Sequence, residues 1–387
     1  MKINIVMGFF LPVPPAAGGA VEKSWHRLAL ELACRGHDVT VLSRRWPDWA
    51  ERETQAGVTH LRVPGFAHRR KLWLNLLLDL IWSLRIFIKL PAADITVVNA
   101  VALPCLLGAL KPSAGRVVVM PGRMPKGQFL VYNHVARVMA TSTPVRTAVL
   151  AEDPRWAPVT RVYGYPVNTT VFSAPRIPGN RVITLGYIGR IHREKGLDLL
   201  VDGLSLLAAR ADLPPWRVLF CGPSDVARGG SGPEYRDTLA SQLARFLPAT
   251  HMTFAEAEFN EAALAGRYRE IDLFCYPSLA EQGETFGVAV VEAMAAGAVP
   301  VVSDLACFRD FVRPGVNGAT FDHTLPDPAA RLARVLAELL ASPDRRATLA
   351  RHARADAQAY DFSAYAERLL ADFQALVSPL DHDREIV

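Results

Sequence analysis

Apolar segments of strand length alternate with amphipathic helical segments along both halves of this chain, and this alternation constrains the fold most. In the N-terminal half, residues 2–6 and 37–43 read as strands, and the amphipathic helix 21–33 lies between them. In the C-terminal half, a short apolar strand at 185–188 leads into a helix that opens near residue 196. Strands joined through helices run parallel. We therefore expect an α/β protein of two Rossmann-like domains that face each other across a cleft.

A break in this periodicity marks the expected domain boundary at residues 169–181. Three residues there interrupt both helix and strand patterns: Pro175, Pro178 and Gly179. We assign residues 1–172 to an N-terminal domain and residues 173–357 to a C-terminal domain. A chain of 387 residues with 50% hydrophobic content is long and apolar enough to fill two cores.

Two glutamates at the apolar run 287–297 give the best indication of a functional site. Glu292 stands among small and aliphatic residues, where an uncompensated buried charge is costly, so a polar group must meet it. Glu284 lies upstream in a loop, and the helix that follows it presents free backbone N–H groups and a positive dipole end to a phosphate. On this segment alone, a helix-capping Glu284 and a structural ion pair at Glu292 are equally good readings.

A second segment places two cations around a turn from strand to helix. The strand ends at Gly189, Arg190 follows, and Lys195 precedes Gly196 at the start of the helix. Arginine grips phosphate oxygens in a bidentate fork and lysine acts as a mobile point charge, so the spacing suits a diphosphate. The alternative is that both side chains are merely solvated at a loop end.

Together the two segments resemble the family-4 retaining glycosyltransferases of the GT-B fold. That family has Gly-Arg, four residues and Lys-Gly, and far downstream Glu-x-Phe-Gly and Glu-Ala-Met. The matching residues here are Gly189, Arg190, Lys195, Gly196, Glu284, Phe286, Gly287, Glu292, Ala293 and Met294. The resemblance implies that residues 358–387 cross back onto the N-terminal domain, which holds the acceptor, while the C-terminal domain binds the nucleotide sugar.

The resemblance also implies roles for the matching residues. Arg190 and Lys195 hold the nucleotide diphosphate, Glu284 the hydroxyls of the donor sugar, and Glu292 the ribose. The helix start supplies further donor contacts through Phe286, Gly287 and Val288. The expected catalytic set is Glu284, Arg190 and Lys195.

The activity that the resemblance implies is transfer of a sugar from a UDP- or GDP-linked donor with retention of the anomeric configuration. No metal ion or other cofactor takes part. The acceptor is a saccharide or a lipid-linked saccharide, in cell-surface polysaccharide, lipopolysaccharide or glycolipid assembly. In front-face attack the departing phosphate takes the acceptor proton; otherwise a carboxylate of the N-terminal domain must act as nucleophile.

Two further positions in the N-terminal half bear on the site. Gly18 and Gly19 resemble the family's glycine loop, which lies under the donor phosphates, although an ordinary flexible turn among prolines is the alternative. The family often has a histidine after the fourth strand, and the segment 117–128 has none. Arg123 and Lys126 in that segment are candidates for binding an anionic acceptor, and a solvated basic loop is at least as good a reading.

The charge balance excludes one class of partner. The chain has 43 Lys and Arg against 38 Asp and Glu, a net charge of +5, with a pI near 9.0. No zinc finger or basic-aromatic stacking motif accompanies this charge, so we exclude nucleic acid and prefer a membrane surface or a phosphorylated lipid.

Residues 68–90 fit contact with a membrane surface. The segment combines a basic start at Arg69, Arg70 and Lys71 with a long apolar run. A narrow polar stripe interrupts that run at Asn75, Asp79 and Ser83. It is too interrupted to span a bilayer, but such a helix can lie in the headgroup region. A buried helix of the N-terminal domain is the alternative, and the sequence leaves both open.

The five cysteines and ten histidines show no spacing typical of metal ligands. The cysteines lie singly in apolar segments, which predicts reduced core residues. The prolines at 12, 14 and 15 interrupt the apolar start, so we expect no signal peptide. We therefore expect a cytoplasmic protein, and contact with the inner face of the membrane stays an open alternative.

Two rival classes remain. A nicotinamide-dependent dehydrogenase should show Gly-x-Gly-x-x-Gly after a strand and an acidic residue closing the second strand, where this chain has Ser43, Arg44 and Arg45. A non-catalytic GT-B subunit that only binds sugar nucleotide should have lost Glu284 or Lys195, and both are present.

Overall fold

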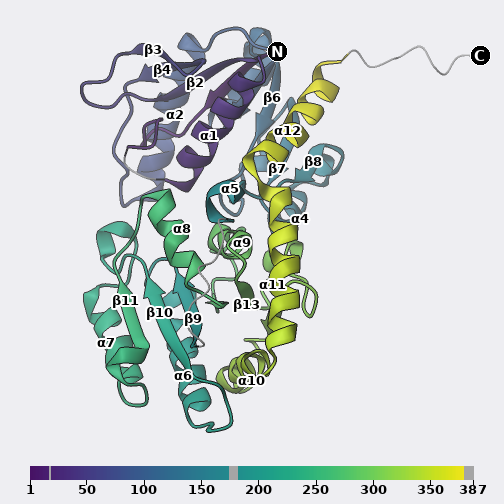
Figure 1. The fold of residues 1–387 in the computed structure, drawn as a ribbon. Helices are drawn as coiled ribbons and strands as arrows, with labels where there is room; N and C mark the ends of the chain where they lie inside the picture. Colours follow the sequence, from purple (N-terminus) through teal and green to yellow (C-terminus); the bar gives the residue numbers. More distant parts are fainter. Residues whose placement is uncertain (17–18, 174–181, 379–387) are drawn as a thin grey trace, which may run out of the picture. The chain divides into compact units, whose positions relative to one another are not determined.

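The protein is described by a computed structural model that covers residues 1–16, 19–173 and 182–378. It divides into two compact units (Figure 1). The N-terminal unit comprises Met1–Tyr165 and Phe362–Val387, and the C-terminal unit comprises Pro166–Asp361. Gly18 and the three residues that mark the expected hinge, Pro175, Pro178 and Gly179, lie outside the described residues.

The sheet of the N-terminal unit has eight described strands in the order β3-β4-β2-β1-β5-β6-β7-β8. All neighbours run parallel except β3 and β4. The strands are β1 (Lys2–Val6), β2 (Asp38–Arg44), β3 (Arg52–Gln55), β4 (Val58–Val63), β5 (Ile95–Val98), β6 (Arg116–Val119), β7 (Val135–Ala140) and β8 (Thr160–Val162). At the centre β1 pairs with β5, and the strand order reverses between these two.

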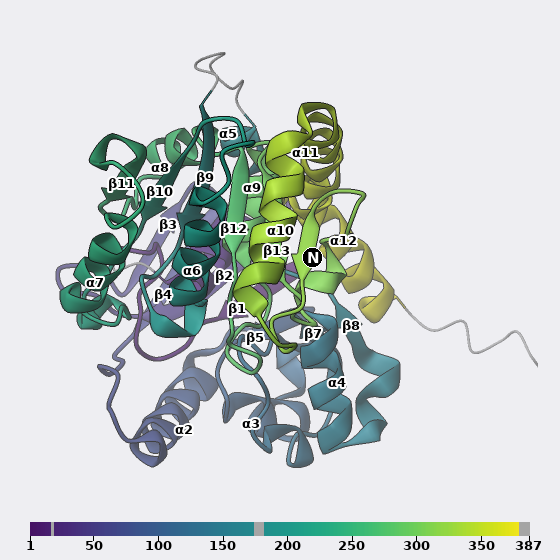
Figure 2. The same cartoon turned by 90° about the horizontal axis from the view of Figure 1, so that it is seen from below.

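Helices cover both faces of this sheet. They are α1 (Ala20–Cys34), α2 (Leu72–Lys89), α3 (Leu103–Leu110), α4 (Thr143–Glu152) and α12 (Phe362–Val377). Helices α2, α3 and α4 share one hydrophobic core with the strands, and Figure 2 shows them together along one side of the unit. Helix α12 packs against α1 instead, so the last described helix belongs to the N-terminal unit.

The C-terminal unit has six described strands, all parallel, in the order β11-β10-β9-β12-β13-β14. They are β9 (Ile183–Ile188), β10 (Trp216–Cys221), β11 (Met252–Ala255), β12 (Leu273–Tyr276), β13 (Val299–Ser303) and β14 (Ala319–Phe321). The helices are α5 (Thr169–Phe172), α6 (Leu197–Ala208), α7 (Pro233–Leu243), α8 (Glu261–Arg269), α9 (Val288–Ala295), α10 (Pro328–Ala341) and α11 (Pro343–Ala357). Helix α6 packs with α7 and α10, and α9 packs with α5 and α11. The predicted pair of parallel-sheet domains is confirmed.

The units divide at Tyr165 and Pro166, a few residues before the boundary expected from the sequence. The segment that follows is tied to the C-terminal unit, because Val167 forms a bridge with Asp361 and the Thr169 hydroxyl donates to the Asp361 carboxylate at 2.6 Å. The second division, after Asp361, also lies a few residues from the expected start of the returning helices at residue 358.

Helix α2 buries its polar stripe and exposes apolar residues, which is the reverse of an ordinary amphipathic helix. Asp79 and Ser83 of its polar stripe are buried, together with Trp82 and Ile86. Asp79 accepts hydrogen bonds from two backbone N–H groups at the start of α3, at 3.1 and 2.7 Å. The outward positions are apolar instead: Leu72, Trp73, Leu76, Leu77, Leu80, Leu84 and Ile88 are all exposed. No helix among the described residues is long and apolar enough to cross a bilayer.

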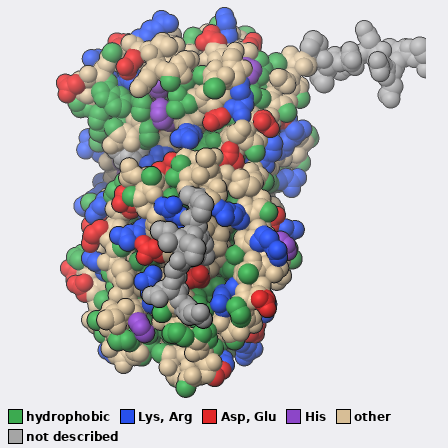
Figure 3. Space-filling view, viewed as in Figure 1, with side chains coloured by type: hydrophobic (Ala, Val, Ile, Leu, Met, Phe, Trp, Pro, Cys, Tyr) green, Lys and Arg blue, Asp and Glu red, His purple; other side chains and the backbone are tan. Residues whose placement is uncertain are grey.

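The expectation that the five cysteines are core residues can now be assessed. Cys221, Cys275 and Cys307 are buried as predicted, but Cys34 and Cys105 are exposed, so the prediction was wrong for these two. Cys34 is the last residue of α1, and the turn at Arg35 and Gly36 follows it. On the face drawn in Figure 3, outside the grey residues, basic and acidic side chains are interspersed.

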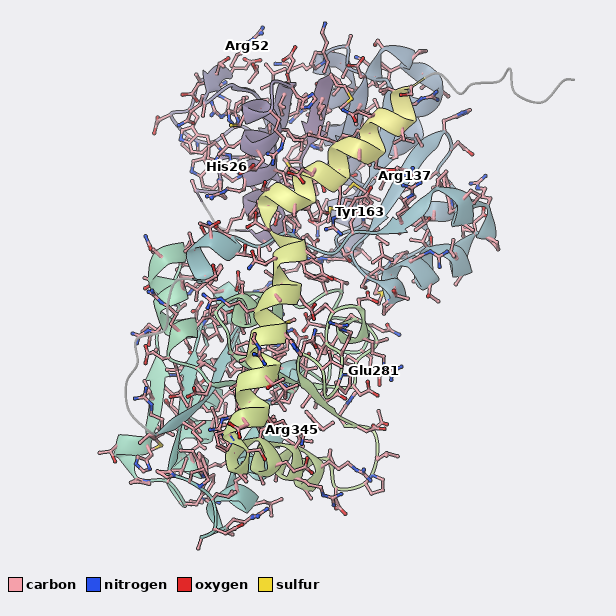
Figure 4. The ribbon with its side chains drawn as sticks, turned by 45° about the vertical axis from the view of Figure 1, so that its right-hand side comes forward. His26, Arg52, Arg137, Tyr163, Glu281 and Arg345 are labelled. Atoms are coloured by element: carbon pink, nitrogen blue, oxygen red, sulfur yellow. The ribbon has the colours of Figure 1, made fainter. Side chains whose placement is uncertain are left out.

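A buried ionic cluster anchors α12 to the sheet. Asp372 accepts hydrogen bonds from Arg137 at 2.7 Å through both oxygens, from Arg161 at 2.7 Å and from the Tyr163 hydroxyl at 2.6 Å. Arg137 and Asp372 are both buried, and Figure 4 shows Arg137 and Tyr163 beside α12. Burial and the bond to Asp372 raise the pKa of Tyr163, which keeps the phenol a neutral donor.

We predict that Asp372→Asn lowers the free energy of unfolding of the N-terminal unit by about 3–5 kcal/mol, because Arg137 would keep a buried charge without its counter-ion. Urea unfolding followed by circular dichroism measures this. The control Glu338→Gln breaks the exposed ion pair between Glu338 and Arg345 at 3.3 Å and should cost less than about 1 kcal/mol. If both variants unfold like the wild type, the cluster does not anchor α12.

Candidate functional site

The predicted donor-binding residues lie where the strand order of the C-terminal sheet reverses. From β9 the chain passes to β10 on one side, whereas β12 lies on the other side of β9. The loops that leave the carboxyl ends of β9 and β12 therefore diverge, and open α/β sheets bind ligands at this position. Arg190 and Lys195 lie in the first loop, and Glu284 lies in the second.

Gly196 allows these two loops to touch. Its φ of +67° is in the left-handed region, and a Cβ added there would lie 2.0 Å from the carbonyl oxygen of Pro277. Any other residue would push the start of α6 away from the loop that follows β12. The backbone N–H of Leu279 also donates to the carbonyl of Glu194 at 2.8 Å. These contacts hold Lys195, which directly precedes Gly196, close to the second loop.

A buried ion pair between Lys195 and Glu284 forms the centre of the site. Nζ of Lys195 donates to Oε2 of Glu284 at 2.7 Å, and the two side chains are only 6% and 11% exposed. Neither charge could be buried alone at this depth without a large desolvation cost, so each depends on the other. The ammonium also lies 5.4 Å from the centroid of the Tyr276 ring, a cation–π contact.

Two buried tyrosines pack against this pair. The rings of Tyr187 and Tyr276 stack with centroids 5.7 Å apart. Burial, reinforced by the charge of Glu284, raises the pKa of both phenols well above the ordinary value. The Tyr187 hydroxyl donates to the backbone carbonyl of Arg190 at 2.7 Å. Both tyrosines therefore stay neutral and fix the loop rather than act as bases.

Arg190 is shared between a carboxylate and a backbone carbonyl. Its guanidinium donates to Glu194 at 2.7 Å and to the carbonyl of Gly229 at 2.9 Å, and the side chain is partly exposed. Glu194 also lies 4.0 Å from Nζ of Lys195. One carboxylate thus stands between the two predicted diphosphate-binding cations, and a diphosphate at this place would compete with it.

Helix α9 begins at Val288, directly after Gly287, which has a left-handed φ of 98°. The first backbone N–H groups of the helix therefore open toward the loop that carries Glu284. Phe286 is buried, and its ring packs against Phe311. Its side chain thus supports the loop.

The sequence placed Glu292 among small and aliphatic residues and so predicted a buried charge, and the prediction of full burial was wrong. Glu292 is half-buried, because one side of α9 is left partly open. The expected polar partner is present: the Tyr268 hydroxyl on α8 donates to Oε2 of Glu292 at 2.8 Å. Burial and the Glu292 charge raise the pKa of Tyr268.

Two of the predicted N-terminal contacts lie at a cavity of about 490 Å³ within the N-terminal unit. Gly19 and Arg123 line it, whereas Lys126 does not, and Gly18 is outside the described residues. Gly19, the residue before α1, has a φ of +94°, and a Cβ there would lie 2.1 Å from the carboxylate of Glu22. A larger residue could therefore not take this backbone conformation at the start of the helix. The roles of these residues stay predictions.

Three residues of these sites were not found from the sequence. Glu194 is one of several charged residues in its loop, and Tyr268 lies on a different helix from Glu292, so no local signal marked either. Glu22 was visible as an acidic residue in the first turn of α1, but its burial at a cavity was not. Among the described residues no group of three His, Cys, Asp or Glu side chains is placed to hold a metal ion.

Comparison with known proteins bears on these sites. Residues 171–356 match the family described as Glycosyl transferases group 1. The phosphatidyl-myo-inositol mannosyltransferase of Mycobacterium tuberculosis (strain ATCC 25618 / H37Rv) is 31% identical over 208 residues, which are 53% of this chain and 50% of that protein. The chain therefore spans about half the length of this relative.

Solved structures resemble the chain over almost its whole length. Sucrose-phosphate synthase from Thermosynechococcus elongatus matches with a TM-score of 0.75 and 20% identity, over 97% of this chain and 98% of that one. Anabaena Alr3699/HepE in complex with UDP and glucose matches with a TM-score of 0.68 and 18% identity, over 97% and 100%. At such identities the likeness shows the fold alone, and it confirms the predicted GT-B fold.

We predict that Lys195→Met and Glu284→Gln each lower the free energy of unfolding, Lys195→Met by about 3 kcal/mol or more because it leaves a buried carboxylate without its counter-ion. The double variant should lose less than the sum of the two, since no unpaired charge remains. Chemical unfolding of the four proteins in a double-mutant cycle measures this coupling. Additive losses would mean that the two charges do not stabilise each other.

Proposed function

We propose that this chain, whose residues 171–356 match the group 1 glycosyl transferases, transfers a sugar from a UDP- or GDP-linked donor to an acceptor hydroxyl. The observation that carries this proposal is the meeting of Lys195, Arg190 and Glu284 where the C-terminal sheet reverses its strand order. Cations for a diphosphate and a carboxylate for sugar hydroxyls thus lie together. The HepE structure, which holds UDP and glucose on a similar fold, supports this donor class.

In the proposed reaction the bond between the anomeric carbon and the diphosphate breaks, and negative charge grows on the departing phosphate. Lys195 and Arg190 stabilise that charge, and the first N–H groups of α9 add to it. Glu284 accepts hydrogen bonds from the donor sugar hydroxyls while it shares Lys195 with the phosphate. Glu292 binds the ribose, with Tyr268 holding its carboxylate in place.

We propose retention of the anomeric configuration by front-face attack, without a metal ion. In this scheme the departing phosphate oxygen accepts the proton of the acceptor hydroxyl, so the enzyme needs no separate base. Both cations that neutralise the diphosphate are side chains, which is the role that a divalent ion has in other transferases. The pairing of Arg190 and Lys195 with Glu194 keeps these cations preorganised.

For the acceptor we propose a saccharide or a lipid-linked saccharide in glycolipid or cell-surface polysaccharide assembly. The name of the mannosyltransferase relative, which includes phosphatidyl-myo-inositol, supports a lipid-linked acceptor. The exposed apolar face of α2 supports it as well, since Arg69, Arg70 and Lys71 are exposed directly before that face. This combination suits the headgroup region of an anionic membrane.

We expect the wild type to release nucleotide slowly from one member of a panel of UDP- and GDP-sugars, without acceptor and with a metal chelator present. Arg190→Ala should lower this rate by about 10²-fold or more, because it removes a charge that stabilises the leaving group. The control Arg345→Ala removes a solvent-exposed arginine of α11, labelled in Figure 4, and should keep the wild-type rate.

Chromatographic detection of the free nucleotide measures both variants. Binding without cleavage, detected as a thermal shift, would favour a non-catalytic sugar-nucleotide-binding subunit. Cleavage that disappears with the chelator would contradict the metal-free scheme.

We also predict that Leu80→Asp with Leu84→Asp weakens binding to vesicles containing anionic phospholipid by about tenfold or more, because two apolar contacts are lost and two negative charges are added. Both leucines are exposed, so the fold should tolerate the change. Leu206→Asp on α6, at 46% exposure, is the matched control and should bind as the wild type does. Cosedimentation measures this, and equal binding by all proteins would contradict a role for α2.

A further inference from the structure

The cavity of the N-terminal unit lies where the sheet of that unit reverses its strand order. It is lined by Gly8, which follows β1, by Val98 at the end of β5 and by Val119 at the end of β6. This is the position at which an open parallel sheet binds a ligand. Its volume of about 490 Å³ lies within the range of ~300–1,000 Å³ that is usual for small-molecule sites.

Most polar side chains that line the cavity are already bonded within the protein. Asp79 accepts from the backbone of α3 at 2.7 Å. Asn99 accepts from the Trp25 indole at 3.0 Å and donates to the carbonyl of Val6 at 3.1 Å. The Tyr132 hydroxyl donates to the carbonyl of Val101 at 2.7 Å. These groups shape the cavity, but they already form hydrogen bonds within the protein.

Glu22 is different. Glu22 is only 5% exposed and lines the cavity, yet within the described residues it forms no ion pair, and the hydrogen bond that lowers its pKa comes from its own backbone. Burial raises the pKa of Glu22 above its ordinary value. A buried carboxylate without a counter-ion is costly, so it persists where a ligand can satisfy it.

Arg123 provides the second unused group. It is exposed at the cavity, and among the described residues no ion-pair partner is found for it. The loop that carries it lies against the start of α1, since a Cβ on Gly122 would be 3.6 Å from Val21, the residue before Glu22. Burial raises the pKa of Tyr165, the charge of Glu22 raises it further, and the charge of Arg123 lowers it. The two groups therefore line the same cavity from neighbouring segments.

We propose that this cavity binds a polyol that carries an anionic substituent, with Glu22 accepting hydrogen bonds from its hydroxyls and Arg123 pairing with its anion. A carboxylate accepts from two vicinal hydroxyls at once, and guanidinium holds a phosphate in a fork. The inference rests on the proposed function, because this polyol is the acceptor of the sugar. Glu22 orients it, and no bond to Glu22 forms.

Calorimetric titration of the full chain tests this with two pairs of probes: myo-inositol with its 1-phosphate, and glucose with its 6-phosphate. We expect the phosphorylated member of at least one pair to bind more tightly than its neutral partner. Glu22→Gln should weaken both members of that pair about tenfold, as expected for a lost hydrogen bond to a charged group. Arg123→Gln should weaken only the phosphorylated member, down to the affinity of the neutral one.

Lys23→Gln is the control, since it changes an exposed charge beside Glu22 that does not line the cavity, and it should bind as the wild type does. Glu22→Gln should fold, because it removes an unpaired buried charge; thermal melting verifies this. The inference is overturned if no probe binds the wild type, or if Glu22→Gln binds all probes unchanged. Failure of the wild type to bind or cleave any nucleotide sugar overturns the proposed function instead, whatever the probes do.

Discussion

The ion pair between Lys195 and Glu284 is the contact on which the rest of the C-terminal site depends. Its two members come from loops that are 89 residues apart in sequence, and they meet because β9 and β12 are neighbours whose loops leave in different directions. Gly196 lets the loops approach, and the stacked rings of Tyr187 and Tyr276 give the pair a rigid, dry wall. A charge at this depth without its partner would open the loops to water.

This arrangement also explains why the site uses side chains of opposite sign so close together. Arg190, Glu194, Lys195 and Glu284 form, in this order, a chain of alternating charge. Each charge is balanced by its neighbours, so the cluster is stable as it stands. When a diphosphate and a sugar bind, these side chains exchange one set of polar partners for another. The cost of desolvating the side chains has then already been met in the folded protein.

The alternation of apolar and amphipathic segments predicted the parallel sheets, because that alternation can be seen locally in the sequence. The grouping of Lys195 with Glu284 came from the family resemblance, because the adjacency of β9 and β12 cannot be seen in either segment. It did not predict that Glu292 would be half-buried, because the exposure of α9 depends on which neighbours cover it. Residues 68–90 show the same limit more clearly. Periodicity indicates that a helix has two unlike faces, but not which face the sheet receives. Here the backbone at the start of α3 needed the acceptor that Asp79 supplies, so the polar stripe turned inward.

The cluster around Asp372 has a consequence for the order in which the chain folds during synthesis. The C-terminal unit is one continuous stretch, Pro166–Asp361, and is complete once the ribosome has passed it. The N-terminal unit is made earlier, yet Arg137 must wait for residue 372 before its guanidinium is neutralised. The half of the protein that emerges first is thus the half that is finished last, and the nascent chain must carry an incompletely neutralised sheet for most of its translation.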